Sequence, residues 1–341
     1  NDGKFITEEG LKNSSAKIFK RGTILYTIFA TVGEVAILEK ESATNQAIAG
    51  LEIINDEVDL EYLYYYLKSL KFIMLKKSRG VAQNNINLGI LKNIEIKIPD
   101  KMEQINIAKI LDNIEKIIHK KKKQLKELNT IIKSQFVEMF GNVELNDKYF
   151  YEQEISDIAE ITSSKRIYAN EYQKNGVPFY RSKEIIELGH KKKPSIELYI
   201  SIKKYKEIKE KYGIPKVGDI LITAVGTIGE TWIVNTEEPF YYKDGNVLQI
   251  RLKKENSQLY FKHVLDILIN IFKRKNVSGS SYLALTIEKF KKMKMIIPPI
   301  DLQNQFAEIV KQIDKQKFES MIQLKMMEKI YNIINDRRRY V

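Results

Sequence analysis

Side chains with catalytic chemistry are few in this sequence, and their spacing matches no catalytic motif. The chain has three histidines, His119, His190 and His263, and no cysteine. None of these histidines has zinc-type spacing with another ligand. The sequence also lacks a Gly-x-x-x-x-Gly-Lys-Ser/Thr nucleotide loop, a Gly-x-Ser-x-Gly nucleophile turn and the Asn-Pro-Pro-aromatic element of an amino-methyltransferase. We therefore expect this chain to have no catalytic centre and to bind no metal or cofactor itself.

A larger group of side chains could make hydrogen bonds to nucleic acid. Arginine, amide and hydroxyl side chains suit base edges, whereas lysines mostly hold phosphates. The candidates for base contacts are Arg79, Gln83, Asn84, Asn85, Ser163, Ser164, Lys165, Arg166, Tyr180, Arg181, Ser182, Lys183, Ser280, Ser281 and Tyr282, and those for backbone contacts are His190, Lys191, Lys192 and Lys193. Asn84 and Asn85 could equally cap turns without touching DNA.

The charge of the chain also favours a polyanionic partner. Its 57 basic and 44 acidic residues give a net charge of +13, with a pI near 9.3. Each phosphate that a protein neutralises releases condensed counterions, so such a surplus promotes binding to DNA. An AT-rich genome, which raises lysine and isoleucine usage, would produce the same surplus without any DNA role.

An internal repeat organises the elements that must position these side chains. Residues 22–34 and 218–230, at a shift of 196, are identical at seven of thirteen positions. Further along, the shift becomes 199: Ile98-Pro99 matches Ile297-Pro298, Gln104 matches Gln303, and Gly80 matches Gly279. Two matching blocks in one order indicate a duplicated domain.

Each copy has the same predicted elements. A strand-rich block with glycines comes first, as in residues 219–233. A helical stretch follows at 60–76 and 259–275, then a short strand that stops at proline, at 94–99 and 293–298. The second copy starts near Asn142, so about 55 of its residues have no counterpart in the first copy. We expect that the numbered chain lacks its natural beginning, which should resemble residues 143–196.

A long helix is predicted to end each copy. Residues 104–140 contain no proline, and Gly141 is a plausible C-terminal stop. Alternate steps of four and three from Ile107 meet eight apolar residues in ten, and the equivalent positions from Phe306 meet seven. This periodicity is typical of a coiled coil, so we expect the two helices to pack on each other. Two helices that each cover their own domain are the alternative.

Several charged and aromatic runs are explained more simply by solvent exposure or core packing than by DNA contacts. Residues 119–123, a histidine followed by four lysines, and residues 337–339, three arginines, are more typical of a solvated helix face than of contacts to DNA or an acidic partner. Trp232 and the run Tyr64–Tyr66 are expected in the core rather than stacked on bases. No apolar run is long enough to span a bilayer, the first residues are no signal peptide, and the missing cysteines fit a reducing cytosol.

The order of these features closely resembles the specificity subunit of type I restriction–modification systems. The stretches that carry the resemblance are Gly176-Val-Pro-Phe-Tyr-Arg181, Gly218–Thr223, Thr227-Ile-Gly229, Gly279–Ser281, Met295–Pro298 and Gln303 in the second copy, and Gly22–Thr27, Gly33, Thr44–Gln46, Gly80–Gln83, Ile96–Pro99 and Glu103-Gln104 in the first. Together they span essentially the whole chain, and the missing start of the first domain is the main departure.

The resemblance implies an α+β fold with two target-recognition domains, 1–98 and 142–297, separated by antiparallel helices at 99–141 and 298–341. It implies a bipartite, asymmetric site on double-stranded DNA, with one half read by each domain and the gap fixed by the helices. Two methyltransferase subunits, and restriction or translocase subunits in some complexes, would supply S-adenosylmethionine, ATP and Mg²⁺ chemistry in the cytoplasm, near the nucleoid. The alternatives are the recognition half of a fused type II-like restriction/methylation enzyme, a stand-alone nuclease, or a coiled-coil scaffold.

Overall fold

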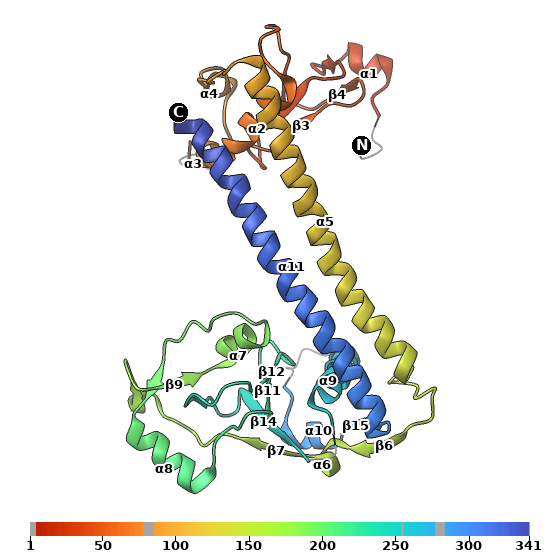
Figure 1. The fold of residues 1–341 in the computed structure, drawn as a ribbon, viewed down its shortest axis with the longest axis vertical. Helices are drawn as coiled ribbons and strands as arrows, with labels where there is room; N and C mark the ends of the chain where they lie inside the picture. The colour runs from red at the N-terminus through yellow and green to blue at the C-terminus, as the bar shows by residue number, and fades with distance from the viewer. Residues whose placement is uncertain (1–4, 78–84, 254–255, 277–283, 341) are drawn as a thin grey trace. The chain divides into compact units, whose positions relative to one another are not determined.

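The computed structural model describes residues 5–77, 85–253, 256–276 and 284–340. The chain forms two compact units, Asn1–Lys126 with Lys317–Val341, and Glu127–Gln316 (Figure 1). Both long helices, α5 (Lys101–Phe140) and α11 (Ile300–Tyr340), contribute a segment to each unit. Each unit therefore contains one copy of the repeat together with part of the helical pair.

The first unit is built on a small antiparallel sheet in the order β3-β2-β5. Its strands are β2 (Ile24–Thr27), β3 (Val35–Ile37) and β5 (Ile48–Leu51), with a separate pair formed by β1 (Ile18–Phe19) and β4 (Ser42–Ala43). The helices are α1 (Glu8–Lys12), α2 (Leu60–Ser69), α3 (Lys71–Lys77) and α4 (Leu88–Lys92). Tyr65 and Tyr66 of α2 are buried against this sheet and Tyr64 is partly buried, as expected.

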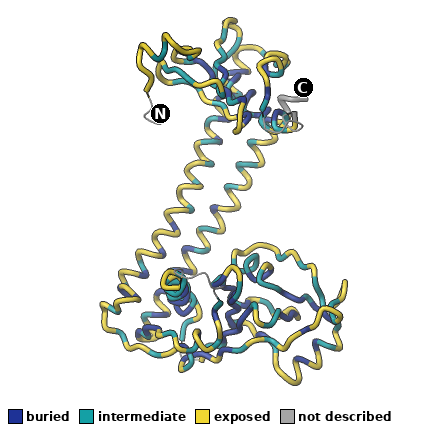
Figure 2. The backbone as a smooth tube through the Cα atoms, turned by 180° about the vertical axis from the view of Figure 1, so that it is seen from behind, coloured by how far each residue is buried: buried dark blue, intermediate teal, exposed yellow. Residues whose placement is uncertain are grey.

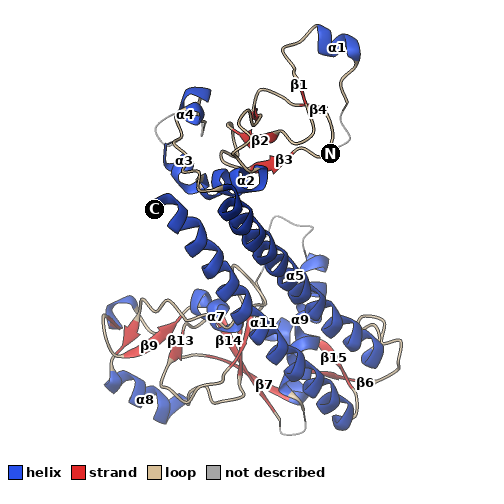
Figure 3. Cartoon of the chain, turned by 45° about the horizontal axis from the view of Figure 1, so that its top comes forward, coloured by secondary structure: helices blue, strands red, loops and turns tan. Residues whose placement is uncertain are grey.

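The second unit contains two four-stranded sheets. The first has the order β12-β11-β14-β7 and is antiparallel throughout, with β7 (Ala159–Ser163), β11 (Ile220–Thr223), β12 (Thr231–Ile233) and β14 (Val247–Leu252). The second has the order β13-β9-β10-β8, with β8 (Tyr172–Gln173), β9 (Val177–Tyr180), β10 (Tyr199–Ile200) and β13 (Tyr241–Tyr242). Figure 3 shows these strands in red among the surrounding helices.

Helices and one further strand pair complete the second unit. They are α6 (Ile155–Ile158), the 3-10 turn η1 (Ala169–Glu171), α7 (Ser182–Gly189), α8 (Ile202–Tyr212), α9 (Gln258–Asn276) and α10 (Ile287–Lys291), with β6 (Tyr151–Glu154) paired to β15 (Lys294–Ile297). One face of the first sheet, carrying Ile220 and Ile250, packs with α9 in the largest core. The opposite face, carrying Leu221 and Trp232, packs in a smaller core near α7. Trp232 is thus a core residue, as predicted.

The long helices pair in opposite directions, which confirms the predicted antiparallel arrangement. In the first unit, Lys122 forms an ion pair with Glu328, and Gln124 lies 3.4 Å from Ser320. In the second unit, the ring of Phe136 lies 5.4 Å from that of Phe306. As the residue number increases along α5, the number of the residue that it contacts on α11 therefore decreases. Figure 2 shows buried or half-buried residues recurring along both helices between exposed ones.

The predicted 3.5-residue seam agrees with the burial of these helices. All ten seam positions on α5 are buried or half-buried, including the polar exceptions Lys121 and Gln135. Helix α5 ends where expected: Gly141 has a φ of 69°, and its N–H donates to the carbonyl of Val137 at 2.8 Å. On α11 the seam is buried or half-buried from Phe306 to Ile334, and the side chain of Arg338 lies outside the description.

A buried glutamine repeats in both copies and confirms the duplication in three dimensions. The side chain of Gln104 accepts from the N–H of Asp59 at 2.8 Å and donates to the carbonyl of Pro99 at 2.8 Å. Gln303 accepts from Ser257 at 3.0 Å and donates to Pro298 at 2.9 Å. Both amides are almost fully buried. Each glutamine therefore ties the start of a long helix to its own domain.

One predicted element is wrong. Residues 94–99 form no strand, whereas the matching stretch of the second copy forms β15. β15 is held by β6, which lies at the start of the second domain. A strand needs a hydrogen-bonded neighbour. The apolar alternation of 94–99 is therefore real, but the described residues offer it no partner strand.

Candidate nucleic-acid interface

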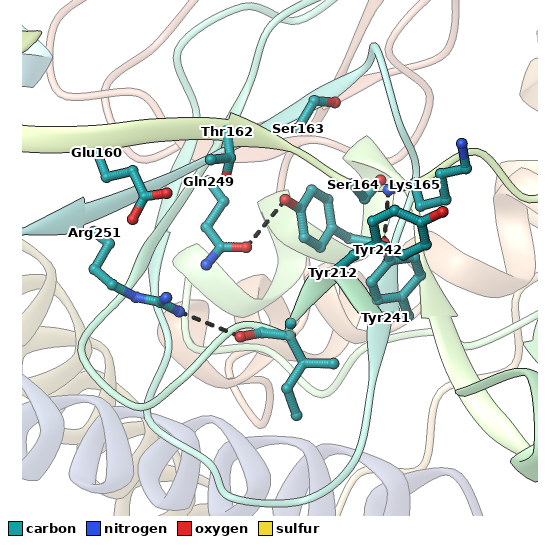
Figure 4. A pocket seen from close by; sticks show the side chains of 12 residues that line it. Glu160, Thr162, Ser163, Ser164, Lys165, Tyr212, Tyr241, Tyr242, Gln249 and Arg251 are labelled. Atoms are coloured by element: carbon teal, nitrogen blue, oxygen red, sulfur yellow. Dashed lines mark hydrogen bonds between the residues drawn. The ribbon is translucent and has the colours of Figure 1, made fainter. Parts of the chain in front are cut away.

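A row of polar side chains lies on one face of the first sheet of the second unit. Strands β7 and β14 are antiparallel, and their register sets Glu160 opposite Arg251 and Thr162 opposite Gln249. These four residues alternate with Ala159, Ile161, Leu248 and Ile250, whose side chains face the core. The polar row lines a pocket of about 270 Å³, which Figure 4 shows together with the side chains around it.

A buried carboxylate organises this polar row. Asp219 is 3% exposed, and its two oxygens accept from Nε of Arg251 at 2.9 Å and from Nη2 at 2.6 Å. Oδ2 also accepts from the Gln249 amide at 2.8 Å and from the N–H of Lys216 at 2.8 Å. These contacts raise the pKa of Arg251 above its ordinary value. The guanidinium is therefore held in one orientation at the pocket wall.

Lysine and tyrosine side chains surround the other end of the pocket. Nζ of Lys165 lies 5.3 Å from the ring centroid of Tyr212, a cation–π distance. The N–H of Lys165 donates to the hydroxyl of Tyr241 at 2.6 Å, and burial raises the pKa of that phenol. Arg166 is exposed and pairs with Asp244 at 2.8 Å. The predicted residues Ser163, Ser164 and Lys165 thus line this pocket, and Arg166 follows them in the chain.

Two of the predicted base contacts have structural partners instead. The ring of Tyr180 is buried and stacks on Phe240 at 5.0 Å, which removes it from the candidate set. Arg181 binds Glu184 at 2.8 Å and Glu197 at 2.9 Å. Because Glu184 is completely buried, the guanidinium is required as its counter-charge. The Glu184 contact also raises the pKa of Arg181.

Most of the remaining described candidates lie on the surface, whereas Ser182 and Asn85 are half-buried. Lys183 is exposed and pairs with Glu197 at 2.7 Å. Lys191, at a φ of 57°, pairs with Asp314 of α11 at 2.9 Å, and its neighbours Lys192 and Lys193 are exposed. Asn85 is half-buried and forms a β-bridge with Phe29. The predicted residues Arg79, Gln83, Asn84, Ser280, Ser281 and Tyr282 lie outside the described residues.

The candidates named from the sequence did not include Glu160, Tyr212, Gln249 and Arg251, which line the pocket. A signal for three of them was present, because residues 159–163 and 247–252 alternate polar and apolar side chains along one strand each. That pattern shows that one strand face is polar, but it does not reveal that the two strands are neighbours. Among the described residues, no group of His, Asp and Glu has the arrangement of a metal site, and no helix is long and apolar enough to cross a membrane.

Comparison with known proteins identifies the family. The sequence model of the type I restriction modification DNA specificity domain matches residues 1–130 and again residues 141–326. A type I restriction enzyme specificity subunit relative from Haemophilus influenzae is 31% identical over 78% of this chain and 66% of its own length. The MjaIX specificity subunit of a type I restriction enzyme from Methanocaldococcus jannaschii is 28% identical over 95% of this chain and 78% of its own.

Solved structures share the fold. The S subunit of a type I restriction-modification system from M. genitalium has a TM-score of 0.63 at 18% identity, over 95% of this chain and 84% of that one. A chain from a structure of a type I restriction-modification complex has a TM-score of 0.54 at 14% identity, over 96% and 85% of the two chains. Because the family model matches two segments that together span most of the sequence, this chain belongs to the type I restriction modification DNA specificity domain family.

Proposed function

We propose that this chain reads a bipartite, asymmetric DNA sequence and directs methyltransferase subunits to it, with one half-site read by each domain. The observation that carries the proposal is the double family match, because the DNA specificity model fits each copy of the repeat. Each copy contains its own antiparallel sheet of similar strand order, but the two copies differ in their surface residues. Such domains suit two different half-sites. The surplus of +13 charges supplies the attraction to the phosphate backbone.

The helical pair would fix the distance between the half-sites. Both helices run without interruption through 40 and 41 residues, and a paired rod resists bending better than a single helix. The buried glutamines Gln104 and Gln303 anchor the first turn of each helix to its own domain. In this proposal the domains choose the bases and the helices choose the gap.

Catalysis belongs to partners in this proposal. Two methyltransferase subunits would bind the chain and bring S-adenosylmethionine, and restriction or translocase subunits, where they join, would bring ATP and Mg²⁺. The relatives carry the name of specificity subunits, which supports a recognition role over a fused restriction/methylation enzyme. We place the complex in the cytoplasm of a prokaryote, at the nucleoid.

The test combines a gel shift with methyl transfer. The purified chain, alone and with its methyltransferase partners, is mixed with genomic DNA fragments and labelled S-adenosylmethionine. We expect label transfer only with the partners present, at a motif of two half-sites separated by a fixed gap. Methyl transfer by the chain alone would contradict a non-catalytic role. A complex that methylates DNA without any sequence preference would contradict the recognition role.

A further inference from the structure

Glu160 and Arg251 lie directly opposite each other on β7 and β14, yet they do not form an ion pair. Arg251 uses Nε and Nη2 for Asp219, and Nη2 also reaches the carbonyl of Ile214 at 3.3 Å. Within the described ranges, Nη1 of Arg251 and the carboxylate of Glu160 have no hydrogen-bond or ion-pair partner. Two donors and a charged acceptor therefore lie side by side, without a hydrogen-bond partner among the residues that the structure describes.

The combination suits a base pair better than a phosphate. A phosphate offers only acceptors and would be repelled by Glu160. In the major groove, a G·C pair offers the O6 and N7 acceptors of guanine beside the N4 amino donor of cytosine. Arginine is the usual partner of guanine, and a carboxylate accepts from cytosine N4. A neighbouring arginine and glutamate thus match both halves of one G·C pair.

The position of these residues in the sheet allows this contact. β7 is an edge strand in the order β12-β11-β14-β7, and β14 is its only neighbour in the sheet, so the two strands form one edge of it. A two-stranded antiparallel ribbon is narrow enough to enter the major groove. Glu160 is exposed, and the Arg251 side chain is 37% exposed. Figure 4 shows both side chains together at one end of the pocket.

We propose that Glu160 and Arg251 together read one G·C base pair in the half-site of the second domain. Nη1 of Arg251 donates to the guanine, and the carboxylate of Glu160 accepts from the cytosine amino group. The proposal rests on the proposed function and adds the identity of one base pair to it. Asp219, held by Gln249 and Lys216, is a positioning residue, because it aims the guanidinium before DNA arrives.

A buried hydrogen-bond network supports that aim. The Gln249 amide donates to Asp219 and accepts from the hydroxyl of Tyr242 at 3.1 Å. Tyr242 is 1% exposed, so the network is closed to solvent on that side. A fixed guanidinium loses little freedom on binding. It also cannot rotate to find other partners when the base pair is wrong. An A·T pair in the complex would therefore leave polar groups of this pair of side chains buried without a hydrogen-bond partner.

The experiment uses the full chain with its methyltransferase partners. After the target motif has been mapped, duplexes carrying every alternative base pair at each position of the second half-site are compared in methylation assays. We expect the unmodified complex to discriminate about 10-fold for G·C at one position. Glu160→Gln should weaken this preference there, because a neutral amide accepts less strongly than a carboxylate from the cytosine amino group, and should leave the other positions and the first half-site unchanged. Because Glu160 is exposed, folding should be unaffected, and the unfolding temperature verifies this.

Three further variants keep the result interpretable. Glu152→Gln makes the same change on β6, at an exposed strand position with its own neighbour β15, and should change no base preference. Arg251→Lys keeps the charge opposite Asp219 and should also lose the G·C preference. Lys165→Gln should weaken binding equally for all sequences and lower the salt slope by about one, as expected for a phosphate contact.

The outcomes separate this proposal from the proposed function. A second half-site without any G·C position, or full G·C discrimination in both Glu160→Gln and Arg251→Lys, would overturn the assignment while recognition itself stands. A uniform loss of affinity in both variants would mean that the pair contacts the backbone, and it would overturn the assignment too. If the unmodified complex shows no sequence preference at all, the proposed function fails first.

Discussion

At the scale of single residues, buried carboxylates decide what the neighbouring arginines do. Arg251 is held by Asp219 and Arg181 by Glu184, and the side chains of both acidic residues are at most 5% exposed. Both arginines use Nε and Nη2 for carboxylates, but Arg251 binds the single carboxylate of Asp219, whereas Arg181 binds those of Glu184 and Glu197. Equal residue types thus have different roles, one facing the candidate interface and the other closing the start of α7.

Replacing Arg181 should therefore damage stability before it damages recognition. Arg181→Ala leaves the carboxylate of Glu184 buried without a counter-charge, and removing one member of a buried pair costs about 3 kcal/mol. We expect the second unit of the variant to unfold at a clearly lower denaturant concentration than that of the unmodified chain. Hydrogen exchange of peptides from α7, measured over a denaturant series, checks this. Lys183→Ala removes only an exposed ion pair with Glu197 and should change the stability little. Equal effects of the two variants would contradict the structural role of Arg181.

At the scale of elements, the two copies share a glycine turn that a helix packs against. Gly33 and Gly229 have φ values of 90° and 87°, a region that side chains rarely adopt. A Cβ at Gly229 would lie 2.2 Å from Cγ2 of the core residue Ile269 on α9. At Gly33 the contacts are less close: the Cβ would lie 2.9 Å from Cγ and 3.1 Å from the backbone Cα of Lys71 on α3.

Gly229→Ala should therefore be more destabilising than Gly33→Ala. Both changes strain the backbone by about 1–3 kcal/mol, and Gly229→Ala adds overpacking against Ile269 of about 1–3 kcal/mol. Hydrogen exchange of peptides from β11 and β14 against those from β2 and β5 reports each domain separately. The ranking would be refuted if Gly33→Ala increased the exchange of the β2 and β5 peptides more than Gly229→Ala increased that of the β11 and β14 peptides. That result would mean that the close contact with Ile269 relaxes at little cost.

At the scale of the whole molecule, the helices connect the two reading domains, and their length is the property to vary. The antiparallel register places residues near Lys126 of α5 opposite residues near Lys317 of α11, as the Gln124–Ser320 contact indicates. A change in one helix alone would shift its seam against the other. A change of length must therefore be made in both helices at facing positions to keep the apolar contacts in phase.

A matched insertion of four residues after Lys126 and after Lys317 should lengthen the recognised gap. Four residues add about 6 Å at 1.5 Å per residue, and DNA rises about 3.4 Å per base pair. We expect a gap longer by one or two base pairs, with both half-sites unchanged, in methylome sequencing of cells carrying the variant complex. An active variant that keeps the original gap would contradict the ruler role. An insertion in α5 alone is the control and should lower the unfolding temperature.

Local patterns in the sequence were sufficient for the architecture. Gly22–Glu34 against Gly218–Glu230 revealed the duplication, and the 3.5-residue spacing from Ile107 predicted the helical seam that is buried in the structure. Both signals depend on the order of residues along one segment. The family resemblance rests on the same stretches, and the family match confirms it over both copies.

Only the tertiary structure decided which polar side chains are available to a ligand. Arg251 and Asp219 are 32 residues apart in sequence, and Arg181 and Glu197 are 16 apart, so no local pattern shows that they meet. The strand expected at residues 94–99 failed for the same reason, because pairing needs a neighbour that the segment itself does not contain. Periodicity specifies which face of a segment is apolar, whereas strand order and register determine what lies opposite each charge.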